Sequence, residues 1–185
     1  MNSVYDTIND FCYKRSQISY TDTASFYKLR DDFLEKIKVL KDAESEILNY
    51  YNNSIITGVW ENEMYWAWAA ITRPSHEYLK CFSKVLQTNN DSFPHWRTLD
   101  ALAFMPKEWW PECACIIKAA IELDNPSWSD DDMNKAFEAL RWITDDGGIQ
   151  FNKEKCNNQN DRIARIARYW LFWPYDGEDF NQDDE

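Results

Sequence analysis

Apolar side chains recur every three or four residues along almost the whole of this chain. Phe26, Leu29 and Phe33 are one example, and this spacing places them on one face of an α-helix. Glycine occurs only 4 times, and only the short stretches 55–56 and 148–151 could be extended. We therefore predict an all-α fold without a sheet of three or more strands.

Side chains that cap or interrupt helices mark the boundaries. Ser75 and Ser129 stand where a side-chain oxygen can accept hydrogen bonds from a first helical turn. Pro106 ends one helix, and Pro111 suits the first turn of the next. The predicted helices, about eight in number, cover residues 3–18, 23–51, 60–72, 76–87, 94–105, 111–123, 130–143 and 161–173. The second would be about 45 Å long if unbroken, and the longest predicted loop lies between the last two helices.

Two segments of the second half share a pattern. Residues 80–105 and residues 113–143 each contain an apolar helix, a loop with Pro and Trp, and a second apolar helix. The offset of about 34 to 38 residues is near the period of two-helix repeats. The pattern resembles HEAT-type αα-repeats, which implies antiparallel helical pairs, with stacking in the second half. The alternative is a helical domain without true repeats.

The sequence predicts one helical domain followed by a short tail. Residues 1–174 form the predicted domain, with long helices in 1–57 and stacked helical pairs in 58–174. Residues 175–185 contain six acidic side chains and no aliphatic one. A segment of this composition at a chain end is expected to be mobile.

The charge is strongly negative. The chain has 20 Lys and Arg residues and 32 Asp and Glu residues, which gives a formal charge of −12. This balance excludes nonspecific nucleic-acid binding and disfavours an anionic membrane, because both need a basic surface. No apolar stretch reaches the roughly 18 residues of a spanning helix. We expect no signal peptide, because the first residues lack a basic region followed by an apolar one. The five cysteines are irregularly spaced and odd in number, so we expect free thiols and a cytoplasmic protein.

Residues with catalytic or metal-binding chemistry are sparse. Cys113 and Cys115 are the nearest approach to a metal motif, but a one-residue gap on a helix points the two thiols apart. His76 and His95 each stand at a predicted helix start, where a capping-turn role is the simpler interpretation. Gly147 and its neighbouring glycine are not followed by the Lys-Ser or Lys-Thr of a phosphate loop. We therefore predict no metal, no cofactor and no enzymatic activity.

Tryptophan and acidic side chains together indicate a protein-binding surface. The chain has 10 tryptophans, and neighbours such as Trp109 and Trp110 cannot both lie on one helix face. Tryptophan is favoured at binding hot spots, and an acidic surface attracts a basic partner. The competing interpretation is that these rings fill the core. The candidate partner-binding residues, all within residues 58–146, are Glu61, Glu63, Trp66, Glu108, Trp109, Asp124, Trp128, Asp145 and Asp146.

In size, charge and composition the chain resembles the immunity proteins of bacterial toxin systems. That resemblance implies a non-enzymatic inhibitor that neutralises a basic partner, such as a toxin domain, by covering its active or substrate-binding site. The alternative is a HEAT-like helical adaptor or scaffold for protein–protein interaction, and an enzyme of unrecognised type is a third class. The partner and the oligomeric state are left open.

Overall fold

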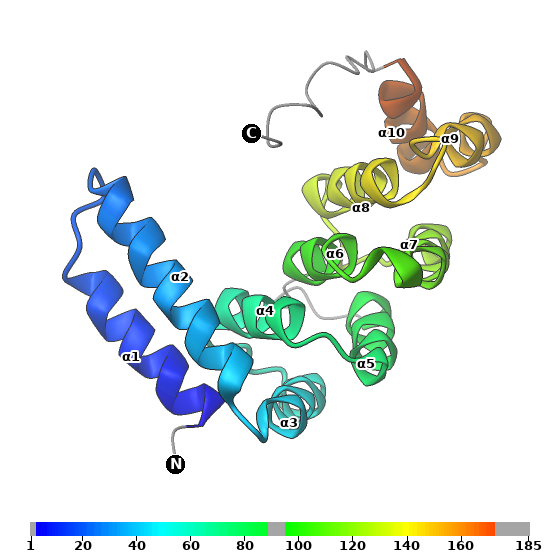
Figure 1. The fold of residues 1–185 in the computed structure, drawn as a ribbon. Coiled ribbons are helices and arrows are strands. Elements are labelled where there is room, and N and C mark those ends of the chain that lie inside the picture. The colour runs from blue at the N-terminus through cyan, green and yellow to red at the C-terminus, as the bar shows by residue number, and fades with distance from the viewer. Residues whose placement is uncertain (1–2, 89–94, 173–185) are drawn as a thin grey trace.

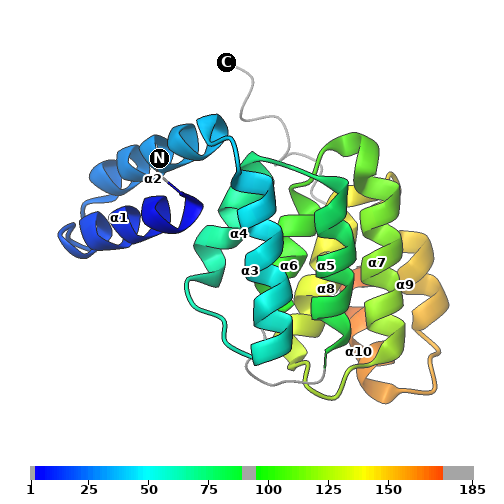
Figure 2. The same ribbon diagram turned by 90° about the horizontal axis from the view of Figure 1, so that it is seen from below.

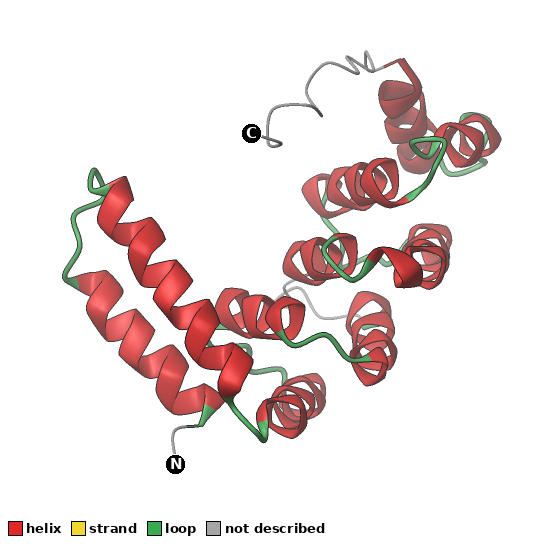
Figure 3. Ribbon diagram, in the orientation of Figure 1, coloured by secondary structure: helices red, strands yellow, loops and turns green. Residues whose placement is uncertain are grey.

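The fold is built from helices alone within the residues that the structure describes. The computed structural model describes residues 3–88 and 95–172, and Figure 3 shows helices and loops there but no strand. This confirms the all-α prediction, with ten α-helices in these ranges rather than about eight. The elements are α1 (Val4–Ser16), α2 (Thr23–Val39), α3 (Ala43–Thr57), α4 (Glu63–Thr72), α5 (His76–Gln87), α6 (His95–Ala103), the short 3-10 helix η1 (Lys107–Trp109), α7 (Trp110–Leu123), α8 (Asp130–Ile143), α9 (Ile149–Lys155) and α10 (Asp161–Phe172).

Local capping chemistry accounts for several helix starts. The Ser129 side chain accepts a hydrogen bond from the backbone N–H of Asp132, and the Asp132 carboxylate accepts one from the Ser129 N–H. Ser3 and Asp6 form the same reciprocal pair at the start of α1. Such a box satisfies two backbone donors that the first turn leaves unpaired. These starts are determined by residues within three positions of each other.

The single long helix predicted over residues 23–51 is wrong. The chain leaves the helical conformation at Leu40, whose ψ is 128°, and α2 and α3 become separate helices. The Arg73 guanidinium donates hydrogen bonds to the carbonyls of Lys38 and Leu40, at 2.6 and 3.0 Å. Arg73 thereby satisfies backbone acceptors that the end of α2 leaves exposed. The α3 helix then continues past the predicted stop and ends at Gly58, whose φ of 70° suits glycine.

The predicted loop between residues 147 and 160 contains α9. Gly148 precedes this helix with a φ of 74°, a conformation that other residues adopt only with strain. The Asp146 carboxylate accepts hydrogen bonds from the backbone N–H groups of Gly148 and Gln150, at 3.0 and 2.8 Å. Phe151 is buried and its ring packs against Phe137 of α8. A short helix of seven residues has too few apolar positions to reveal a period in the sequence.

The helices after α2 lie in two rows. Helices α4, α6, α8 and α10 contact one another in sequence along one row, while α3, α5 and α7 form the second row, which α9 extends (Figure 1). Figure 2 shows that the connections alternate between two opposite ends of the rows. One apolar core runs between the rows and includes the buried side chains of Tyr78, Phe82, Leu99, Ile117 and Phe137.

The first two helices project from this stack. In Figure 2 the pair α1–α2 points away from the remaining helices, and at its base α1 contacts α3 and α4 while α2 contacts α4. At that base Phe11 and Phe33 pack on each other at a ring distance of 5.1 Å and against Trp68 of α4. The acidic tail predicted over residues 175–185 lies outside the described residues.

Candidate partner-binding surface

The nine predicted partner-binding residues lie on opposite ends of the stack. One group lies in the α3–α4 connection, the first turn of α4 and the α7–α8 connection, and comprises Glu61, Glu63, Trp66, Asp124 and Trp128. The other group lies at the α6–α7 and α8–α9 connections and comprises Glu108, Trp109, Asp145 and Asp146. Because successive connections alternate between the two ends (Figure 2), the two groups do not form one continuous surface.

Two of the predicted tryptophans belong to the core. Trp66 is 5% exposed, and its ring stacks on Tyr50 with the centroids 4.4 Å apart. Trp128 is 3% exposed, and its indole N–H donates to the Leu86 carbonyl at 3.2 Å. Neither ring exposes enough surface to act as a partner-binding anchor. Trp109, in contrast, is half-buried beside the exposed His76, with the ring centroids 4.0 Å apart.

The predicted acidic residues differ in what they already contact. The Asp124 carboxylate accepts a hydrogen bond from Asn160 and lies 3.7 Å from the Arg162 guanidinium, so it joins the α7–α8 turn to α10. Asp146 accepts the two backbone hydrogen bonds that begin α9. These two carboxylates support the fold. Exposed carboxylates without such a role are those of Glu61, Glu108 and Asp145.

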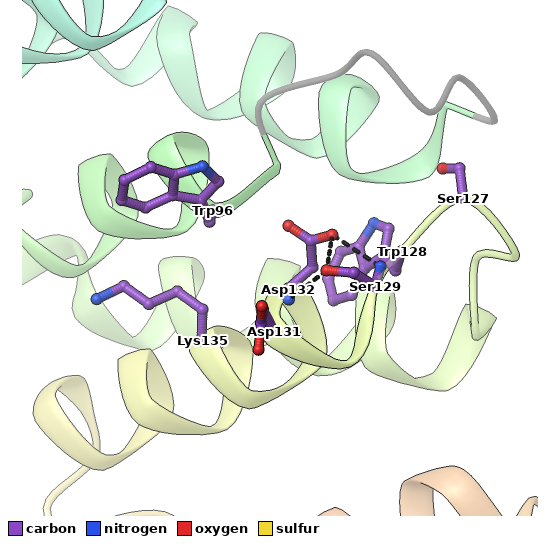
Figure 4. Close-up of a pocket in the computed structure, with 7 residues that line it drawn as sticks. All are labelled: Trp96, Ser127, Trp128, Ser129, Asp131, Asp132 and Lys135. Atoms are coloured by element: carbon purple, nitrogen blue, oxygen red, sulfur yellow. Dashed lines mark hydrogen bonds between the residues drawn. The ribbon is translucent and has the colours of Figure 1, made fainter.

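A pocket of about 770 Å³ lies where α6 begins beside the first turns of α8. Figure 4 shows the Trp96 side chain of α6 on one side and Lys135, Asp131 and Asp132 of α8 on the other. The α7–α8 turn supplies the remaining lining residues, Ser127, Trp128 and Ser129. Of the nine predicted residues only Trp128 reaches this pocket, as part of its buried wall.

Asp131 is the charged residue of the pocket that has no partner among the described residues. The Asp132 carboxylate accepts from the Ser129 hydroxyl and backbone N–H, at 2.7 and 2.8 Å. The Lys135 ammonium lies 2.8 Å from Asp100 and 3.0 Å from Glu138. Asp131 is exposed and makes no hydrogen bond or ion pair with any residue that the structure describes. A free carboxylate beside an indole is a chemistry that suits a cationic side chain.

The ion pairs keep Lys135 charged. Its partial burial by itself lowers the pKa, but hydrogen bonds to Asp100 and Glu138 outweigh that effect and raise the pKa above its ordinary value. Since both carboxylates share this ammonium, Lys135 is not available to bind an anionic ligand. The accessible charge of the pocket is therefore negative.

Two large apolar side chains at α6 are exposed. Trp96 of the helix is 43% exposed, and Phe104, which directly follows the helix, is 68% exposed. The buried stripe of α6 consists instead of His95, Thr98, Leu99, Ala101 and Leu102. In a helix of nine residues two apolar stripes are possible, and only the neighbouring helices decide which one is covered. Asp131 was missed for another reason: an acid in the first turn is sufficiently explained by the helix dipole.

Within residues 3–88 and 95–172 no three His, Cys, Asp or Glu side chains are placed to hold a metal ion. All five cysteines are unpaired thiols. No helix in these ranges combines the length and apolar character needed to cross a bilayer.

No protein-family model, curated protein or solved structure matches the chain.

Proposed function

We propose that the chain is a non-enzymatic αα-repeat protein that binds a basic protein partner. The two rows of helices support a HEAT-like stack of antiparallel pairs, in which each pair buries its apolar face against its neighbours. Stacks of this kind present extended surfaces rather than deep catalytic clefts. The surface most suited to a partner is the pocket between α6 and α8.

The observation that carries the proposal is that Asp131 and Trp96 line the same pocket. An arginine or lysine side chain entering this pocket would meet a free carboxylate and an exposed indole ring. One face of that ring already has the Arg97 guanidinium 3.4 Å from its centroid, so the ring accepts cations in this structure. The negative charge of the whole chain, −12, would speed the approach of a basic partner.

The specific form that we propose is an immunity protein. Such a protein would place its acidic pocket over the basic active or substrate-binding site of a cognate toxin and so block it. The alternative is an adaptor or scaffold that binds partners along the row of α6, α8 and α10. Exposed aromatic rings on these helices or directly after them favour that alternative, namely Trp96, Phe104, Trp142 and Tyr169.

Capture of partners with matched variants tests the proposal. Wild-type chain, Asp131→Asn and Asp161→Asn would each be used as bait with an extract of the native cell, followed by mass spectrometry. Both aspartates lie in the first turn of a helix, but only Asp131 lines the pocket. We expect a basic protein that is bound by the wild type and the Asp161→Asn control and weakened about tenfold by Asp131→Asn.

The salt dependence of binding and the activity of the bound partner distinguish an immunity protein from an adaptor. For an immunity protein, association slows as ionic strength rises, and the captured partner loses its toxic activity when bound. Partners that remain active in the complex favour the adaptor. Capture that is equal for all three baits would contradict the role of the pocket.

A further inference from the structure

The distal part of the α1–α2 pair has no buried side chain. The base of the pair is anchored by Ile8, Phe11, Phe33 and Ile37, all at most 2% exposed. Beyond that base, every residue of the distal arm, which we define as residues 13–30, is exposed or half-buried. Figure 1 shows the arm extending from the stack with no other described helix beside it. Two helices that pack only on each other leave much of their apolar surface in contact with water.

The uncovered side chains of the arm have the composition of an interface. Tyr13, Tyr20 and Tyr27 are 70%, 92% and 52% exposed. Phe26 and Leu29 are only half-buried between the two helices. Tyrosine and arginine are enriched in protein–protein interfaces because each combines a large contact area with a polar group. A surface of this kind fits a protein partner rather than a small molecule.

The arm also has the opposite charge to the rest of the chain. It carries four basic residues and one acidic residue, whereas the other residues of the chain carry 16 basic and 31 acidic ones. Two of the four are already paired with acids just outside the arm: Lys14 with Asp10 at 2.8 Å and Arg30 with Asp31 at 2.9 Å. Lys28 is exposed and forms no hydrogen bond or ion pair with the residues that the structure describes. The basic residues of the arm without an ion pair among the described residues are therefore Arg15 and Lys28, and acidic charge predominates on the rest of the chain.

We propose that the distal arm docks on the acidic body of a second copy of this chain. The body supplies the complementary charge, and it is present at the same concentration as the arm. In a dimer with two-fold symmetry, both arms would be covered at once by reciprocal contacts. This inference goes beyond the proposed function and does not depend on it, because it requires no foreign partner.

Sedimentation of arm variants and a matched control tests whether the arm mediates self-association. We expect the wild type to associate at tens of micromolar in low salt and to dissociate at high salt. Lys28→Glu should weaken self-association about tenfold, and Tyr20→Ala should weaken it as well. Lys153→Glu is the control, since Lys153 is an exposed lysine of α9 far along the chain from the arm. Because all three side chains are exposed, a circular dichroism melt should show that each variant folds.

Cross-linking of mixed copies identifies the contact. Unlabelled and ¹⁵N-labelled chains would be mixed and treated with a zero-length carbodiimide, which joins a lysine amine to a nearby carboxylate. Links between Lys28 of one isotope and Asp or Glu residues of the other would support the proposal. A chain that stays monomeric at all concentrations, or one whose association is unchanged by both arm variants, would overturn it.

Discussion

Exposure separates two pairs of tryptophans with different roles, while the other tryptophans that the structure describes are half-buried. Trp66 and Trp128 are buried in the core, while Trp96 and Trp142 are 43% and 52% exposed. Side-chain size and chemistry are the same in both groups, so the difference arises from the surroundings. A core tryptophan stabilises the fold by burying its ring. An exposed one is available for contacts on the surface.

Substitution of one tryptophan from each group should separate the two roles. We expect Trp128→Ala to lower the free energy of unfolding by about 3–5 kcal/mol, because it leaves a cavity in the core. Trp96→Ala should lower it by less than about 1 kcal/mol. Urea denaturation of both variants measures the difference. If the two variants were equally destabilised, the assignment of Trp96 to the surface pocket would be wrong.

At the scale of helices, side chains from distant parts of the sequence decide where elements end. Arg73 binds the carbonyls at the end of α2 from more than thirty residues away. Arg162 of α10 likewise donates to the Trp128 carbonyl in the turn before α8 and contacts the Asp130 carboxylate. Charged hydrogen bonds of this kind contribute about 1.5–3 kcal/mol. Element boundaries in this protein are therefore partly tertiary properties.

The start of α9 offers a test at this scale. Asp146→Ala removes the acceptor for two backbone N–H groups, so we expect a loss of about 0.5–2 kcal/mol at neutral pH. Hydrogen bonds from the backbone of Gln150 and Gly148 lower the pKa of Asp146 below its ordinary value of 3.8. A carboxyl group with a lowered pKa in the folded state stabilises the protein above 3.8 and loses that effect as pH falls through the lowered pKa.

The stability difference between wild type and Asp146→Ala should therefore be constant from pH 7 to about pH 5 and shrink in more acidic solution. Denaturant unfolding at each pH measures it. Asp145→Ala is the matched control, because Asp145 is the exposed neighbour and makes no hydrogen bond with the described residues. An equal effect of both substitutions at all pH values would contradict the capping role.

At the scale of the whole molecule, burial is distributed unevenly. The stack from α3 to α10 shares one core, but residues 13–30 contribute nothing fully buried to it. Segments with few buried contacts open at a lower free-energy cost than the core does. The molecule is therefore expected to combine a stable body with an arm that opens locally.

Amide hydrogen exchange should reveal this contrast. In dilute protein at high salt, where copies do not associate, we expect protection in residues 13–30 to be at least about a hundredfold lower than in α8. Exchange followed by mass spectrometry gives both values in one experiment. Similar protection in the arm and in α8 would show that the arm is as stable as the body.

Local chemistry in the sequence was sufficient for most of the helices. The capping residues Ser3, Ser75 and Ser129 act through hydrogen bonds to backbone groups within three residues, so their effect can be predicted without a structure. The all-α class follows in the same way, because the spacing of apolar residues and the scarcity of glycine are properties of the chain itself.

The tertiary structure alone decided which side chains meet. Trp96 and Leu99 are both apolar residues of one short helix, yet only packing against neighbouring helices determined that Leu99 is buried and Trp96 exposed. The break after α2 depends on Arg73, whose position opposite Leu40 no local pattern contains. The predicted partner-binding residues lie at two ends of the stack for the same reason. Residues at successive turns are near in sequence, but each helix carries the chain to the opposite end of the stack.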